Sequence, residues 1–98
     1  MSIEIKVEPR ETHTRAELNR LRQSGRIPAS VSGNNIAPVS ISVDEKELLH
    51  LLRGHSHDIL EMDISQYGRQ SVMLREVQKD KVNSGKLLHV DFQQISMN

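Results

Sequence analysis

The sequence predicts a mainly β fold of the α+β class, an antiparallel sheet or small barrel of about six strands with two packed helices. Three observations lead to this prediction. Stretches in which apolar and polar residues alternate are separated by short turn sequences, and they dominate the second half of the chain. Two other stretches begin with helix-capping residues. Strands and helices do not alternate regularly, so a parallel sheet is not expected.

The N-terminal stretch predicts the first strand, because Ile3, Ile5 and Val7 alternate with charged residues until Pro9 ends the pattern. A later stretch has the same alternation at Val39, Ile41 and Val43. Turn sequences at 66–68 and 83–85 then delimit the strands of the second half. The remaining strands are expected at 29–33, 59–64, 71–79 and 86–95.

The first helix is expected to begin at Thr14, because Glu17 follows it at the spacing of a capping box. It should run to Gly25, a residue type that commonly ends helices. Leu18 and Leu21 would face the core.

The second helix is expected over 44–53, because Asp44 and Glu47 repeat the capping spacing and Gly54 closes the segment. Between the two helices, Ile27-Pro28 predicts a break, because a residue before proline avoids helical geometry.

The 98 residues are expected to form a single domain spanning 1–98. Its core must be aliphatic, because Tyr67 and Phe92 are the only aromatic residues. The absence of cysteine excludes disulfides and thiolate chemistry. The chain has no long apolar run, so we expect neither a signal peptide nor a membrane span, and the protein should be soluble and intracellular.

The net charge is zero, but the charges are unevenly distributed. Residues 10–26 hold five arginines against two acids, and residues 69–89 hold five basic residues against two acids. Residues 44–64 hold two basic residues against six acids. If the two basic segments meet in space, one side of the molecule faces anions. Clusters of this size also arise on ordinary solvated surfaces, and both interpretations stay open.

The stretch LHVDFQ, residues 88–93, predicts a strand with one polar face. Side chains at 88, 90 and 92 would share the apolar face, and His89, Asp91 and Gln93 the other. A face exposed only to water explains this pattern. RNA explains it too, because the shallow minor groove of A-form RNA displays 2′-hydroxyls and base edges. A carboxylate accepts from the guanine amino group, and His and Gln can both donate and accept.

The first helix has a basic surface, on which Arg15, Asn19 and Arg22 follow the i, i+4, i+7 spacing of a single face. Arg20 adds a further guanidinium. Guanidinium groups match phosphate oxygens bidentately, which favours a nucleic-acid partner. A solvated helix surface is the alternative.

The chain offers little that resembles catalytic or metal chemistry. The tract His55-Ser56-His57-Asp58, with His50 nearby, lacks the ligand spacing of a zinc motif and is best explained as a solvated loop. His89 and Asp91 could pair as a base and its orienting group, but no nucleophile motif accompanies them. We therefore expect no enzyme activity, metal or cofactor.

Three segments occur in the order LRQSGRIPASVSG (21–33), REVQKD (75–80) and LLHVDFQ (87–93). Together they resemble the bacterial ribosomal protein family L-twenty-five, which includes the general stress protein Ctc. The resemblance covers nearly the whole chain. It implies a small antiparallel six-stranded β-barrel with two short helices. It also implies binding to 5S ribosomal RNA in the large subunit, through the widened minor groove of a loop-E type internal loop.

The resemblance and the residue patterns together give one predicted RNA-binding set: Arg10, Arg15, Asn19, Arg20, Arg22, Gln78, Lys79, His89 and Asp91. The implied partners are 5S ribosomal RNA and the large ribosomal subunit, with no membrane. We expect a monomer away from the ribosome and a ribosome-associated location in the cytoplasm.

The chain departs from the family pattern at several positions. Ser32 stands where members commonly have Tyr, and Thr14 and Ala16 replace glycines. Asp80-Lys81 replaces the usual His-Pro, and an acid there repels phosphate. These departures predict weaker affinity for 5S ribosomal RNA than is typical, or a specialised relative.

A second function stays open, a stress-related barrel-fold module that binds proteins and has weak or no RNA affinity. Its contact face would be the acidic segment 44–64. Longer members of the family have a second β-rich domain after the last strand. Because this chain stops at Asn98, we expect a natural short form or a truncated chain.

Overall fold

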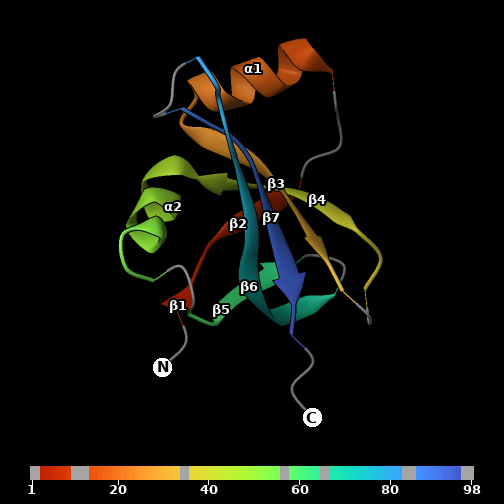
Figure 1. The fold of residues 1–98 in the computed structure, drawn as a ribbon. Helices are drawn as coiled ribbons and strands as arrows, with labels where there is room; N and C mark the ends of the chain where they lie inside the picture. Colours follow the sequence, from red (N-terminus) through yellow and green to blue (C-terminus); the bar gives the residue numbers. More distant parts are fainter. Residues whose placement is uncertain are drawn as a thin grey trace.

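The computed structural model describes residues 3–9, 14–33, 36–55, 58–64, 67–82 and 86–95. Within them the chain forms one seven-stranded sheet and two helices (Figure 1). The elements are β1 (Ile3–Glu4), β2 (Val7–Pro9), α1 (Arg15–Gln23), β3 (Arg26–Ser32), β4 (Val39–Asp44), α2 (Glu45–Leu52), β5 (Leu60–Ile64), β6 (Gly68–Lys79) and β7 (Leu87–Gln94).

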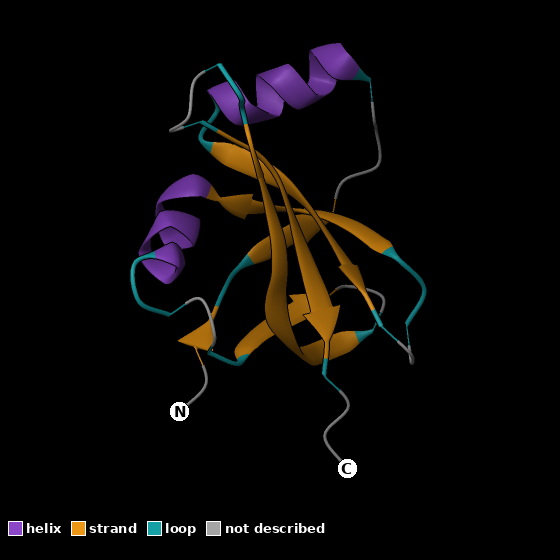
Figure 2. Cartoon of the chain, in the orientation of Figure 1, coloured by secondary structure: helices purple, strands orange, loops and turns teal. Residues whose placement is uncertain are grey.

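The strands follow the order β1-β5-β6-β7-β3-β4-β2, and the sheet curls into a half-barrel (Figure 2). Its two edge strands, β1 and β2, come from one N-terminal segment. Ile5 lies between them, is 2% exposed, and donates its backbone N–H to the Glu61 carbonyl at 3.0 Å. The segment therefore leaves β5 at one edge and reaches β4 at the other, which links the two edges of the curled sheet.

The predicted class, mainly β with two helices, is confirmed, but two details were wrong. The expected N-terminal strand is two strands, so the described residues contain seven strands and not six. The sheet is also not fully antiparallel, because β1 pairs with β5 and β3 with β7 in parallel. Alternation reports which face a residue occupies, but it does not report the partner strand or the strand direction.

The break expected at Ile27-Pro28 was also wrong, because β3 continues through both residues. Pro28 lies opposite Ser42 of β4, whereas the pairing of β3 with β7 begins only at Ala29. Proline is compatible with an extended backbone and lacks only the N–H donor. The prediction excluded helix correctly but overlooked a strand.

Helix α1 begins and ends as predicted. The Thr14 hydroxyl oxygen accepts a hydrogen bond from the Glu17 backbone N–H at 3.3 Å. After the helix, Gly25 has a φ of 88°, a conformation that glycine adopts without a Cβ clash. No α1 residue is fully buried, and Leu18 and Leu21 are only half-buried. The helix therefore packs on the sheet less tightly than predicted.

Helix α2 is attached more firmly. The Asp44 carboxylate accepts from the Glu47 N–H at 3.1 Å, as the capping spacing predicted. Leu48 and Leu51 are buried in the core. Phe92, at 0% exposed, is the only aromatic side chain in this core, and its other members are aliphatic apart from Met62.

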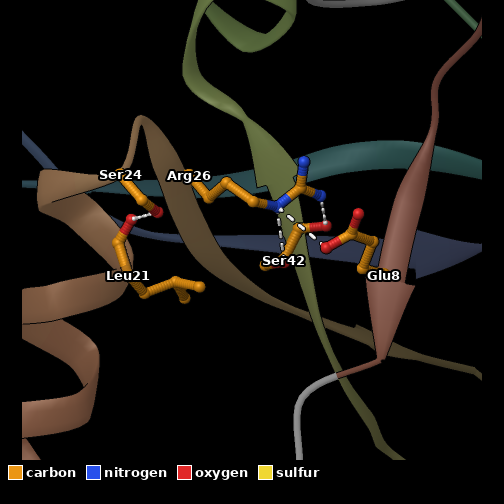
Figure 3. A network of polar contacts seen from close by, with 5 residues as sticks. All are labelled: Glu8, Leu21, Ser24, Arg26 and Ser42. Atoms are coloured by element: carbon orange, nitrogen blue, oxygen red, sulfur yellow. Dashed lines mark hydrogen bonds and ion pairs between the residues drawn. The ribbon is translucent and has the colours of Figure 1, made fainter.

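Arg26 fixes the start of β3 to its neighbours (Figure 3). Its Nε donates to the Ser42 hydroxyl at 2.9 Å, and its Nη2 donates to the Ser42 carbonyl at 2.7 Å. Nε also lies 3.6 Å from a Glu8 carboxylate oxygen on β2. Just before this strand, the Ser24 hydroxyl donates to the Leu21 carbonyl at 2.7 Å. These contacts fix the junction of α1 with the sheet.

Candidate nucleic-acid interface

The polar face predicted for the last strand is present on β7. Val90 and Phe92 are fully buried, whereas His89, Asp91 and Gln93 lie on the outer face. His89 Nδ1 is 3.2 Å from Asp91 Oδ1, and the two side chains are 27% and 29% exposed. They are therefore same-face neighbours that remain accessible to a ligand.

A β-bulge interrupts the alternation at the start of β7. Gln78 pairs with His89 and Lys79 with Leu87, so the register skips Leu88. Leu87 is consequently buried, although strict alternation placed it among the polar residues. Leu88, predicted to lie on the buried face, is only half-buried and lines a groove beside α1.

Neighbouring strands extend the outer face of β7. On β6, Gln78 lies opposite His89 and Glu76 opposite Asp91, and residues paired in this way share a face. On β3, Ser30 lies beside Asp91, and its hydroxyl donates to Asp91 Oδ1 at 2.6 Å. Asp91 therefore connects a serine and an imidazole on two parallel strands. We call the surface formed by five of these residues the polar β-face: Ser30, Glu76, Gln78, His89 and Asp91.

Helix α1 lies across the ends of β3, β6 and β7 (Figure 1). Arg22 joins it to β7, because its Nε and Nη2 donate to the Leu88 carbonyl at 3.2 and 3.0 Å. Its Nη1 donates to Asn19 Oδ1 at 3.2 Å. Since His89 follows Leu88 directly, the basic helix and the polar β-face adjoin. The groove between α1 and β7 is lined by Arg15, Leu18, Asn19, Arg22, Asp80, Lys86 and Leu88.

The other predicted site residues are placed less uniformly. Arg15 lines the groove, and Arg20 is exposed on α1. Lys79 is exposed but follows Gln78 directly, so strand alternation directs it away from the polar β-face. Arg10 lies outside the described residues.

The sequence did not predict three residues of the surface that the polar β-face and the α1–β7 groove form together. Ser30 and Glu76 join the polar β-face only through the β3–β7 and β6–β7 registers, and no local pattern reports those registers. Lys86 was counted within a basic segment, but nothing in the sequence placed it beside α1.

The two basic segments meet only in part. Residues near Arg22 and Lys86 come together at the groove. Arg69, by contrast, is bound to Glu61 at 2.6 Å and lies 3.7 Å from Glu4. The hydrogen bond with the Glu61 carboxylate, and then the negative charges of Glu61 and Glu4, raise the pKa of Arg69 above its ordinary value. This charge is therefore compensated within the protein.

In the histidine-rich tract, His55 Nδ1 lies 2.8 Å from an Asp58 carboxylate oxygen, and the His50 and His55 rings are 5.3 Å apart. His57 lies outside the described residues. The part of the chain that the structure describes contains no group of three or more side chains that could hold a metal ion. It also contains no helix long and apolar enough to cross a membrane.

A sequence model of the Ribosomal L25p family matches residues 5–92. The chain belongs to this family. The resemblance stated from three short segments is thus confirmed, and the match includes all of the polar β-face and α1.

Curated relatives agree with this membership of the Ribosomal L25p family. A protein of Pelotomaculum thermopropionicum is 38% identical over 101 residues, covering 99% of this chain and 48% of the relative. A Bacillus licheniformis protein is 35% identical, covering 95% of this chain and 44% of the relative. A Bordetella avium protein is 40% identical, covering 81% of this chain and 40% of the relative. All three are named large ribosomal subunit protein bL25, and this chain spans less than half of their length.

Proposed function

We propose that this chain is a non-enzymatic RNA-binding module of the large ribosomal subunit that docks on 5S ribosomal RNA. Its membership of the Ribosomal L25p family, and the names of its relatives, support a ribosomal role. In this proposal the chain is associated with ribosomes in the cytoplasm.

One observation carries the proposal: the two hydrogen bonds from Arg22 to the Leu88 carbonyl, at 3.2 and 3.0 Å. They make the basic helix and the polar β-face a single surface. Phosphate contacts position a protein on RNA, and contacts to base edges and 2′-hydroxyls provide specificity. A surface that combines both kinds of group suits a polyanion with an accessible minor groove.

The proposed roles follow the chemistry of each group. Arg15 and Arg20, together with Arg10, neutralise phosphates, and Lys79 is left out of this set because strand alternation directs it away from the polar β-face. Gln78, His89 and Asp91 read the minor-groove edge. The Asp91 carboxylate suits the guanine amino group, and the other two side chains suit hydroxyls, which both donate and accept.

Binding can be tested by gel shift with a 5S ribosomal RNA fragment containing the internal loop, at two salt concentrations. We expect a saturable complex that weakens as salt rises, and a weaker complex with a regular RNA duplex of equal length. Absence of binding to the 5S fragment at low salt would contradict the proposal.

A second candidate function, docking of a protein partner, is favoured by one observation. Five carboxylates line a single groove, on Glu4, Glu8, Asp44, Glu47 and Asp63, against two cations, on Lys6 and Arg26. Such a groove suits a basic protein segment. A pull-down with and without ribonuclease separates the two functions, because partners bound through RNA are lost after digestion and partners bound directly are retained.

A further inference from the structure

Arg22 differs from the other arginines of α1 in the number of its internal contacts. All three of its guanidinium nitrogens donate within the protein, two to the Leu88 carbonyl and one to Asn19 Oδ1. Arg20, two residues earlier, is exposed. Among the described residues, no side-chain hydrogen bond or ion pair involves Arg20. The two arginines carry the same charge but have different surroundings.

Among the described residues, Arg22 is the one α1 side chain that hydrogen-bonds to a strand. No residue of the helix is fully buried, and its C-terminal end passes directly into β3. Arg22 donates its hydrogen bonds to the carbonyl of Leu88. Leu88 is the residue that the pairing of β6 with β7 skips. A residue at a bulge is left out of the ladder, so its carbonyl is available to a side chain. The contact therefore sets where the helix lies relative to His89, the next residue.

We propose that Arg22 is a positioning residue of the RNA site and not a phosphate ligand. It holds α1 against the bulge of β7, so that the exposed arginines and the polar β-face engage one RNA segment together. This inference rests on the proposed function. The planar fork of Arg can direct two N–H groups at one carbonyl, whereas the Lys ammonium is a point charge on a flexible stem. Exchanging Arg for Lys therefore removes the tether and keeps the charge.

The test compares Arg22→Lys with Arg53→Lys, the same change at an exposed arginine just after α2, in binding to the 5S fragment across a salt series. We expect Arg22→Lys to weaken binding about tenfold, with an unchanged slope of log affinity against log salt. Arg53→Lys should bind as the unmodified chain does, because it keeps its charge and α2 supplies no residue to the interface. Unchanged affinity of Arg22→Lys, or a slope lowered by about one, would overturn the positioning role.

Amide hydrogen exchange of the RNA-free protein provides the second measurement. Arg22→Lys should accelerate exchange across 15–23 and leave the amides of β6 and β7 unchanged, whereas Arg20→Lys should change neither. Unaltered exchange of α1 in Arg22→Lys would overturn the tether. If the unmodified chain fails to bind 5S RNA, the proposed function is wrong, and the exchange data still decide whether Arg22 holds the helix.

Discussion

At the scale of single residues, Asp91 connects two strands of the polar β-face. One of its oxygens accepts the Ser30 hydroxyl at 2.6 Å and lies 3.2 Å from His89 Nδ1. Asp91→Asn keeps the shape of the side chain and removes its charge. We expect 5S RNA binding to weaken about tenfold, because a hydrogen bond to a charged group contributes roughly 1.5–3 kcal/mol. Since no cation is lost, the salt slope should stay constant.

The matched control is Asp63→Asn, which makes the same change at an exposed position of β5, a strand that supplies no residue to the interface. Fluorescence anisotropy of a labelled 5S fragment measures both variants. Equal losses in the two variants would show that net charge, and not the local contacts of Asp91, controls binding.

Gly33 is a second residue with a defined role. A Cβ at this position would lie 2.5 Å from the Cβ of Gln94 and 2.7 Å from its Oε1. The Gln94 amide in turn donates to Gln70 Oε1 at 2.6 Å. Gly33→Ala must therefore displace backbone, and we expect it to destabilise the fold by about 1–3 kcal/mol. Thermal unfolding measures this loss, and the control Ser32→Ala should stay within about 0.5 kcal/mol. A Gly33→Ala variant as stable as the unmodified chain would contradict the close packing.

At the scale of elements, the two helices should respond differently to loss of their caps. Thr14 caps α1, which buries no residue fully, whereas Asp44 caps α2, which buries Leu48 and Leu51. Thr14→Ala should raise amide exchange in α1 and leave the global unfolding free energy almost unchanged, because α1 can open locally. Asp44→Ala should lower that global free energy by about 1 kcal/mol. Urea unfolding together with hydrogen exchange measures both effects. Equal global losses would contradict the weaker attachment of α1.

The elements also show how far the sequence can predict this fold. Thr14 and Asp44 identified both helix starts, because a cap involves residues three apart in the chain. The prediction that His89, Asp91 and Gln93 share the outer face of a strand was also correct, because alternation involves residues only two apart in the chain. The change of partner at Ile5 and the neighbour Ser30 of Asp91 were not predicted. They depend on pairings between distant segments, and alternation carries no information about those pairings.

At the scale of the whole molecule, zero net charge does not determine how the protein meets a polyanion. Charges farther from the RNA than a Debye length, about 8 Å at physiological ionic strength, are largely screened. Binding should depend on Arg15 and Arg20 of α1, Lys86 of the groove and Arg10, and a contact of about four cations gives a salt slope of roughly −3 to −4.

Two variants with the same net charge separate local from global electrostatics. Arg20→Ala removes an exposed cation from α1, and Arg53→Ala removes one from the C-terminal end of α2, which supplies no residue to the interface. We expect Arg20→Ala to reduce the magnitude of the salt slope by about one and Arg53→Ala to leave it unchanged. Filter binding of the 5S fragment between low and physiological salt measures the slopes. If both variants reduce the slope equally, the overall charge governs the association. That result would contradict the proposal that α1 and the polar β-face form the RNA site.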